Sequence, residues 1–288
     1  MHADEVETDP SLVQRLVAGR FPEWADLPVE PVFPLGTDNA NYRLGTDKLV
    51  RLPRQEEKVA GLERELEWLP VLAHTVPLAI PEVLGRGGPA HGFPFPWAVF
   101  TWVEGENVSV DEIDSEQAAT DLADFILAVR SLDAADAPPG LRRGTLRELD
   151  DWVRAGAAKL VGRYDAAGLL AAWDEALEVP PWEGPPTWCH CDLDLRNLLF
   201  REGRPSGVLD WGWAGVGDPA SDTAVGWKVL PAEAREPFWH SLGADEEEIA
   251  RARGWTLMQC AGALWYYTPQ NNPALYHEAE RWLSELLG

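Results

Sequence analysis

The most specific pattern in this chain lies in two short segments, His190-Cys191-Asp192-Leu193-Asp194-Leu195-Arg196-Asn197 and Asp210-Trp211-Gly212. Between them, residues 198–200 and 207–209 are predicted to form short strands around a polar turn at residues 201–205. A hairpin of that size would return the chain and bring Asp210 close to Asn197. Carboxylate and amide oxygens are ligands that Mg²⁺ accepts. The pattern therefore predicts a site for magnesium-assisted phosphoryl transfer.

The first segment also has the spacing of the kinase catalytic loop, His-x-Asp-Leu-x-x-x-Asn. In such a loop the Asp accepts a hydroxyl proton and the Asn holds a metal ion. A lone His-x-Asp arises by chance, and its His is more often a hydrogen-bonded core residue. Here the His, the Asp, the Asn, the hairpin and the second Asp-x-Gly occur together, which favours the catalytic interpretation over a purely structural one.

Length and hydropathy indicate a globular enzyme of one large lobe or two closely packed lobes, because 288 residues exceed a single typical core. No stretch reaches the roughly 18 apolar residues of a membrane span. The acidic start of the chain is unlike a secretion or transit peptide. We therefore expect a cytoplasmic protein without a membrane partner, either a monomer or a homodimer.

The net charge is −24, from 48 acidic and 24 basic residues. This charge disfavours nucleic-acid binding, since a phosphate backbone requires a basic face. An acidic cleft that attracts a cationic substrate is one interpretation, and simple solubility is at least as good an alternative. The three cysteines, Cys189, Cys191 and Cys260, form no disulfide framework. A structural zinc site is disfavoured because it needs four ligands and no second Cys/His pair exists.

The N-terminal part of the chain alternates strand and helix patterns. A helix is predicted at residues 9–20, with Asp9 as its N-cap and Pro10 at its first position. A second helix is predicted at residues 56–73, with leucines on one stripe and Pro70 near its end. The remaining periodic segments predict a five-stranded sheet, with strands at 29–35, 42–45, 49–52, 81–85 and 97–102.

After residue 104 the pattern becomes helical. The predicted helices cover residues 114–132, 151–164, 169–177, 219–228, 245–266 and 273–287. The fold class is therefore α+β, a bilobal protein-kinase-like fold. Its mostly β N-terminal lobe is expected at residues 1–103, and its helical C-terminal lobe, with the catalytic loop and acceptor site, at residues 104–288. Nucleotide is expected to bind between the lobes.

These residues resemble the aminoglycoside phosphotransferase family, a branch of the kinase-like fold. The resemblance covers roughly residues 25 to 285. It is carried by Trp188–Leu199, Val208–Gly212 and the segment Gly217-Asp218-Pro219-Ala220-Ser221-Asp222, which separates this branch from protein kinases. The resemblance implies transfer of a phosphoryl group from ATP, or alternatively GTP, with Mg²⁺, to a small-molecule hydroxyl.

The same resemblance implies the roles of individual side chains. Asp192 corresponds to the catalytic base, and Asn197 and Asp210 to the magnesium ligands. His190 corresponds to an orienting member of the loop, and Asp222 to the buried carboxylate that braces the loop through backbone N–H groups. For Asp218, just before Pro219, helix capping is the larger expected role.

Two positions depart from the family pattern. Cys191 stands where the family usually has Gly, and a left-handed backbone there costs a non-glycine residue ~1 kcal/mol or more. Arg51 stands where the third strand usually supplies a Lys to the nucleotide phosphates. Glu65 corresponds to the partner of that strand cation, with a solvated surface glutamate as the alternative. Lys48 is predicted to be a solvated turn lysine.

Further nucleotide contacts are expected from two backbone segments. One is the turn-rich loop 36–41, including Gly36 and Asn39. The other is the linker at residues 100–103, where Phe100 and Trp102 are expected to offer backbone groups to adenine.

Two functions remain in competition. The first is a small-molecule kinase whose acceptor is an aminoglycoside, a macrolide or a related amino alcohol or sugar. The alternative is a catalytically weak nucleotide-binding pseudokinase, suggested by Arg51 and Cys191. The intact Asp192, Asn197 and Asp210 favour the kinase, because functional decay usually removes one of them.

Overall fold

The computed structural model describes residues 5–33 and 38–288. The chain divides into two compact units: residues 1–105 together with 207–212, and residues 106–206 together with 213–288. Within the described ranges, no helix is long and apolar enough to cross a membrane.

The first unit contains the predicted five-stranded antiparallel sheet, in the order β1-β2-β3-β5-β4. Its strands are β1 Val29–Pro31, β2 Asn39–Leu44, β3 Lys48–Pro53, β4 Val83–Gly87 and β5 Trp97–Thr101. The predicted loop 36–41 is partly wrong, because β2 already begins at Asn39, where Asn39 pairs with Pro53 and Asn41 with Arg51. The β3 partner completes the ladder, and it outweighs the turn preference of asparagine. Gly36 lies outside the described residues.

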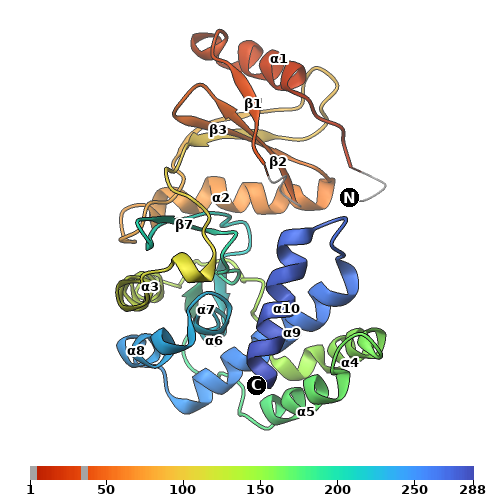
Figure 1. Cartoon of the computed structure of the whole chain (residues 1–288). Helices are drawn as coiled ribbons and strands as arrows, with labels where there is room; N and C mark the ends of the chain where they lie inside the picture. The colour runs from red at the N-terminus through yellow and green to blue at the C-terminus, as the bar shows by residue number, and fades with distance from the viewer. Residues whose placement is uncertain (1–4, 34–37) are drawn as a thin grey trace. The chain divides into compact units, whose positions relative to one another are not determined.

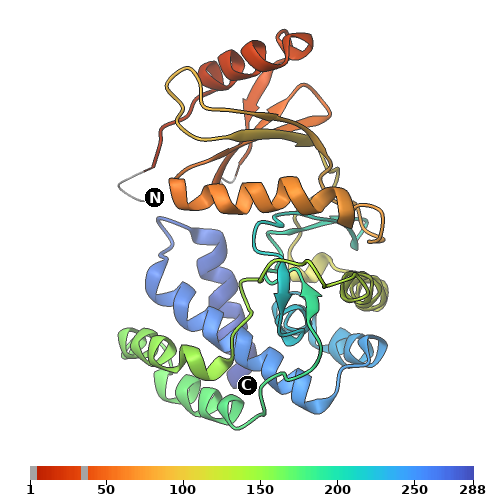
Figure 2. The same ribbon diagram turned by 180° about the vertical axis from the view of Figure 1, so that it is seen from behind.

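Alternation along β3 decides what each face of the sheet carries. Val50 and Leu52 pack with Leu16 and Val17 of α1 (Pro10–Arg20) in one apolar core. The α1 helix begins as predicted, because the Asp9 carboxylate accepts a hydrogen bond of 2.7 Å from the Leu12 amide. Figures 1 and 2 show α1 and α2 on opposite sides of the sheet. Arg51 consequently faces α2.

The α2 helix (Val59–Leu72) follows a short 3₁₀ turn at Glu56–Lys58. Leu62, Leu69 and Leu72 form its buried stripe, together with Glu65, as the helical spacing predicts. Pro70 lies in the last turn, where the missing N–H group removes one helical hydrogen bond, and the helix ends two residues later.

The second unit is helical and is organised around α9 (Glu246–Tyr266), which packs against α4, α5, α6 and α10 (Figure 1). Asp245 caps α9 by accepting a hydrogen bond from the Glu248 amide at 2.7 Å. The other helices are α3 Ser115–Arg130, α4 Asp150–Leu160, α5 Ala166–Leu177, α6 Ala220–Thr223, α7 Val225–Lys228, α8 Ala232–Leu242 and α10 Pro273–Leu287.

One helix prediction was wrong, and one further helix was not predicted. The single helix expected at residues 219–228 is broken into α6 and α7, and the Thr223 hydroxyl at the break donates to the Pro219 carbonyl at 3.3 Å. Such side-chain bonds compete with helical continuation. The α8 helix was missed because Pro231 and Pro237 resemble helix breakers. Pro231 instead precedes the first turn, and Gly243 ends the helix in a left-handed conformation.

Short strands carry the motif segments of the second unit. β6 (Thr187–Cys189) pairs antiparallel with β9 (Gly215–Gly217). The connection between α3 and α4 runs over this pair, with Pro139 bridged to Val216 (Figure 2). β7 (Leu198–Arg201) and β8 (Arg204–Val208) form the predicted hairpin. Its turn is tighter than predicted, because Glu202 and Gly203 both adopt left-handed conformations, as in a two-residue type I′ turn.

Candidate active site

The loop after β6 is fastened at its start by the buried carboxylate of Asp222. Its two oxygens accept hydrogen bonds from the backbone N–H groups of His190, at 2.7 Å, and Cys191, at 2.8 Å. Burial raises the pKa of Asp222, against the lowering effect of His190 and of these amides. The His190 ring is fully buried, and its Nδ1 accepts from the Asp192 amide at 3.3 Å. Asp222 and His190 therefore fix the backbone that carries Asp192.

Asp192 projects from this loop with a half-buried side chain. The Asn197 amide group donates to the Asp192 carbonyl at 2.8 Å and to Oδ2 of its carboxylate at 3.2 Å. Burial alone would raise the pKa of Asp192. The positive charges of Arg196, Lys228 and Arg142, with His190, outweigh that effect and hold the pKa below its ordinary value. The carboxylate is therefore ionised at neutral pH.

The remainder of the loop is held by polar contacts within the same unit. The Arg196 guanidinium pairs with the buried Asp194 carboxylate, which also accepts from the Arg196 amide at 2.9 Å. The Asn107 side chain donates to the carbonyls of Leu195 and Leu198, both at 3.0 Å. These contacts hold the part of the loop that follows Asp192.

Cys191 has a left-handed backbone, with φ of 70°. The strain expected from the Gly-to-Cys departure is therefore present. Its side chain is buried, and Gly140 is packed so closely that a Cβ added there would lie 2.8 Å from the Cys191 sulfur. A hydrogen bond with Cys191, together with burial, raises the pKa of the Cys189 thiol well above its ordinary value. All three cysteines are free.

In the first unit, Arg51 of β3 and Glu65 of α2 form a buried ion pair, with exposed fractions of 5% and 1%. Glu65 Oε1 also accepts a hydrogen bond of 3.0 Å from the Trp211 amide. Burial opposes the Arg51 charge, but Glu65 and then Asp210 overcome it and raise the guanidinium pKa. The predicted partnership of Arg51 and Glu65 is thus present, and it reaches the segment that carries Asp210.

Asp210 has a left-handed backbone, with φ of 60°. The next two residues pack against α2. Trp211 is almost fully buried. The backbone of Gly212 lies so close to that of Gly61 in α2 that a Cβ on Gly212 would be 3.2 Å from the Gly61 Cα. Strained backbone at a non-glycine residue is typical of functional sites.

The remaining residues that the sequence analysis discussed for nucleotide binding, Phe100, Trp102 and Lys48, lie in or beside β3 and β5 of the sheet. Phe100 is fully buried in β5. The prediction of a solvated turn lysine was wrong for Lys48: it is the first residue of β3, and its side chain is only 15% exposed, pairs with Asp47 at 2.8 Å and lies over the Trp24 ring. The Trp102 amide donates to the Asp47 carbonyl at 2.8 Å. Because this amide is already bonded, the Trp102 carbonyl is the backbone group that is left for a nucleotide.

Comparison with protein-family models matches residues 31–283 to the phosphotransferase enzyme family. The chain belongs to this family. It is accordingly a small-molecule phosphotransferase with a kinase-like fold. A search of curated protein sequences found no match.

Solved structures share the fold of this phosphotransferase. One is the GDP complex of wild-type aminoglycoside 2′-phosphotransferase-IIIa, with 18% identity, a TM-score of 0.75, and coverage of 97% of this chain and 99% of that chain. The GDP and kanamycin complex of APH(2″)-IIIa has 19% identity, a TM-score of 0.74 and coverage of 95% and 97%. Macrolide 2′-phosphotransferase MphH from Brachybacterium faecium has 21% identity, a TM-score of 0.64 and coverage of 96% and 97%.

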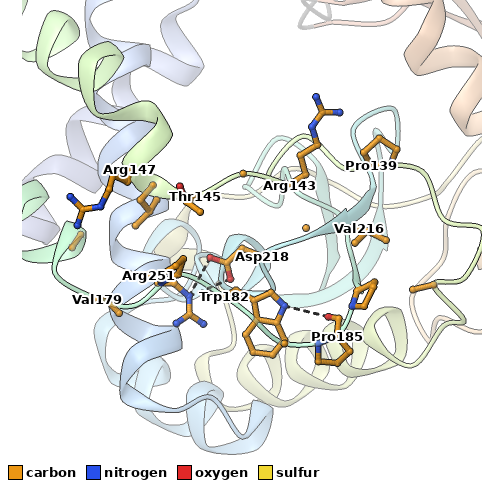
Figure 3. A pocket seen from close by; sticks show the side chains of 18 of the residues that line it. Pro139, Arg143, Thr145, Arg147, Val179, Trp182, Pro185, Val216, Asp218 and Arg251 are labelled. Carbon is orange, nitrogen blue, oxygen red and sulfur yellow. Dashed lines mark hydrogen bonds and ion pairs between the residues drawn. The ribbon is translucent and has the colours of Figure 1, made fainter.

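The second unit of the phosphotransferase also contains a cavity of about 780 Å³ (Figure 3). It is lined by parts of segments 134–147, 176–186 and 216–218, together with Arg251. Arg251 and Asp218 form a buried ion pair there, at 3.3 Å between Nε and Oδ2. Asp218 also accepts from the Ala220 amide at 3.0 Å and from the Trp255 ring nitrogen at 3.1 Å. Its expected role as a helix cap is not found, because α6 begins after Pro219 without a side-chain cap. The lining residues include neither Asp192 nor Asn197.

Sequence reasoning missed two cations that act on Asp192, Lys228 and Arg142. The sequence did contain a signal for Lys228, since this lysine interrupts the apolar run Val225–Leu230. In the structure the residue is only 1% exposed. Arg142 gave no such signal, because it lies in a loop beside Arg143 and its neighbours become apparent only in the fold.

Proposed function

We propose that this phosphotransferase transfers the terminal phosphoryl group of ATP, or of GTP as the second candidate, directly to a small-molecule hydroxyl. The observation that carries the proposal is the Asp192 carboxylate on a loop fastened by hydrogen bonds of Asp222, Asn197 and Asn107. The candidate acceptors are aminoglycosides, macrolides and related amino alcohols or sugars. Solved relatives with this fold support that range, one bound to GDP and kanamycin and another a macrolide phosphotransferase.

In this proposal Asp192 is the catalytic base. The acceptor oxygen attacks the terminal phosphorus, its proton passes to Asp192, and the bond to the bridging oxygen breaks to release the nucleoside diphosphate. His190 acts as an orienting residue, because its ring accepts from the Asp192 amide. The low pKa of Asp192 makes it a weak base, so orientation of the hydroxyl is a large part of its expected contribution.

We propose Asn197 and Asp210 as the ligands of a magnesium ion. The Asn197 side chain uses its NH₂ group for Asp192, and no described donor engages its Oδ1, so an oxygen ligand is left for the ion. The described residues contain no cluster of three or more acidic, His or Cys ligands. Mg²⁺ is usually held by one or two carboxylates plus substrate phosphates, and Asn197 and Asp210 would supply the protein's share of its ligands. When bound, the ion would neutralise charge on the phosphate oxygens.

We propose that Arg51, oriented by Glu65, supplies the positive charge for the nucleotide phosphates in place of the usual lysine. A guanidinium binds phosphate oxygens in a bidentate manner. Backbone groups of Gly36, Asn39, Phe100 and Trp102 remain proposed nucleotide contacts, with the Trp102 carbonyl rather than its amide as the available group.

The test is release of nucleoside diphosphate from Mg-ATP and Mg-GTP across a panel of aminoglycosides, macrolides, amino alcohols and sugars. Asp192→Asn should lower acceptor-dependent turnover by ~10²–10⁴-fold while nucleotide affinity stays nearly unchanged. Asp174→Asn is the matched control, because Asp174 is exposed and pairs with Arg154 at the surface.

If the Asp192→Asn variant turned over as fast as the wild-type protein, the assignment of Asp192 as the base would be contradicted. Nucleotide binding without turnover by the wild-type protein, across the whole panel, would instead favour the alternative, a weak nucleotide-binding pseudokinase.

A further inference from the structure

The cavity in the second unit has the size and composition of a small-molecule site. Its volume of about 780 Å³ lies within the range of ligand pockets, roughly 300–1,000 Å³. Its lining is mainly apolar and consists largely of alanine, valine, leucine and four prolines, together with Trp182. Ligand pockets add to such walls a few polar groups that fix the orientation of the ligand. Here one of the polar lining groups is buried: Arg251 of α9 is only 5% exposed.

The walls of this cavity are held in place by hydrogen bonds of the backbone. The Gly140 amide donates to the Val216 carbonyl at 2.8 Å, which fixes the segment before α4 along β9. The Trp182 ring nitrogen donates to the Pro185 carbonyl at 3.3 Å. The lining prolines restrict the backbone further, because their rings fix φ. The cavity is therefore largely pre-formed, which lowers the cost of ordering its walls around a ligand.

Arg251 is buried with part of its hydrogen-bonding capacity unused. Its Nε lies 3.3 Å from Oδ2 of Asp218, and its Nη1 donates to the Pro180 carbonyl at 3.3 Å. The Asp218 carboxylate is itself shared with the Ala220 amide and the Trp255 ring nitrogen. In the described part of the chain, no acceptor engages Nη2 of Arg251. A guanidinium has five N–H donors in a planar fork, so an oxyanion in the cavity would supply the missing acceptor.

The charged side chains of the cavity also favour an anion. They are three arginines, Arg143, Arg147 and Arg251, and one carboxylate, that of Asp218. The whole chain has the opposite balance, with 48 acidic and 24 basic residues. The excess of arginine disfavours a polycationic ligand such as an aminoglycoside at this place.

Trp182 provides an aromatic surface next to the buried cation. The Arg251 guanidinium lies 5.9 Å from the centroid of the Trp182 ring, and Figure 3 shows both side chains grouped with Asp218. A planar ring that carries a carboxylate can contact both, with its ring against Trp182 and its oxygens on Arg251. We propose that this cavity is a second ligand site, separate from Asp192, for an aromatic carboxylate. Neither nucleotide nor turnover enters this proposal.

Three naphthalene derivatives of similar size test the site: the anion 2-naphthoate, the neutral 2-naphthalenemethanol and the cation 2-naphthylmethylammonium. Calorimetry should show that 2-naphthoate binds at least about tenfold more tightly than the alcohol, and that the cation binds most weakly. Inorganic phosphate, an anion without an apolar body, should not compete. The proposal is overturned if 2-naphthoate does not bind, if it binds no better than the alcohol, or if phosphate displaces it.

Arg251→Lys tests the role of the buried cation. The single ammonium group of lysine can remain with Asp218, but it leaves no second donor for the ligand. The affinity for 2-naphthoate should therefore fall at least about tenfold, whereas the affinity for the alcohol should stay unchanged. Arg253→Lys is the matched control, because Arg253 lies in the same helix, pairs with Glu175 and does not line the cavity. Unchanged binding of 2-naphthoate by Arg251→Lys would contradict the proposed contact.

Two further variants test the cavity without altering its buried ion pair, so the proposal stays testable if Arg251→Lys does not fold. Val179→Trp introduces a larger ring into the lining and should abolish binding of both 2-naphthoate and the alcohol. Trp182→Ala should weaken both, because it removes the aromatic surface. Trp152→Ala is its control, since Trp152 is similarly exposed, at 43% against 38%, and lies outside the cavity. Melting temperatures verify that each variant is folded. Undiminished binding by a folded Val179→Trp protein would show that the ligand lies elsewhere.

Discussion

At the scale of single residues, Cys191 shows how a functional loop tolerates a poor local choice. Its φ of 70° suits glycine, yet the residue is buried and carries a thiol. The Asp222 carboxylate takes both the His190 and the Cys191 amides, which imposes this conformation from outside the residue. The surrounding structure thus overrides a local cost of ~1–2 kcal/mol.

A pair of variants isolates this cost. Cys191→Ala removes the sulfur but keeps the strained Cβ, whereas Cys191→Gly removes both. We expect the Gly variant to be more stable than the Ala variant by about 1 kcal/mol, measured by urea unfolding. At an ordinary position the order is reversed, because Gly costs roughly 0.5–1 kcal/mol relative to Ala. An Ala variant equal to or more stable than the Gly variant would show that the backbone here is unstrained.

At the scale of elements, the sequence predicted those features of helices that depend on neighbouring residues, such as N-caps and buried faces. Asp9 and Asp245 were readable as helix starts because an N-cap acts within its own turn. Leu62 and Leu69 marked the buried face of α2 through periodicity. β6 and β9 were missed, since each has three residues and depends on a partner distant in the sequence.

The ion pair of Arg51 and Glu65 links three elements, because it joins β3 to α2 and, through the Trp211 amide, to residues 207–212. Removing one partner leaves a buried charge and costs about 3–5 kcal/mol, which would confuse a binding measurement. The informative variant is therefore the double substitution Arg51→Met with Glu65→Gln. Gln keeps an acceptor for the Trp211 amide. We expect near-native stability and at least about tenfold weaker nucleotide affinity.

A second strand–helix pair provides the control. Arg86 of β4 pairs with Glu63 of α2, but both side chains are well exposed. The double variant Arg86→Met with Glu63→Gln should therefore change neither stability nor nucleotide affinity measurably, since exposed pairs contribute ~0–1 kcal/mol. Equal nucleotide affinity in both double variants, measured by calorimetry, would remove Arg51 from the nucleotide site and strengthen the pseudokinase alternative.

At the scale of the whole molecule, charge imbalance is the dominant feature that composition predicted. With 48 acidic and 24 basic residues, the acidic side chains exceed the basic ones by 24, so their charge is not balanced even where every base is paired. The exposed ion pairs, such as Arg204 with Asp121 at 2.9 Å, each contribute little. Repulsion among the unmatched carboxylates is therefore expected to outweigh them at neutral pH.

Salt should consequently stabilise this protein at neutral pH. Raising NaCl from ~0.01 M to ~0.15 M shortens the screening length from about 30 Å to about 8 Å, which weakens repulsion between distant carboxylates. We expect the melting temperature at pH 7 to rise over this range. Near pH 4.5, the isoelectric point of the sequence, net repulsion vanishes and the same salt screens only favourable pairs. The melting temperature there should stay constant or fall, with light scattering used to verify that the protein remains dispersed. A fall at pH 7 would mean that ion pairs, rather than the net charge of −24, control the electrostatic part of its stability.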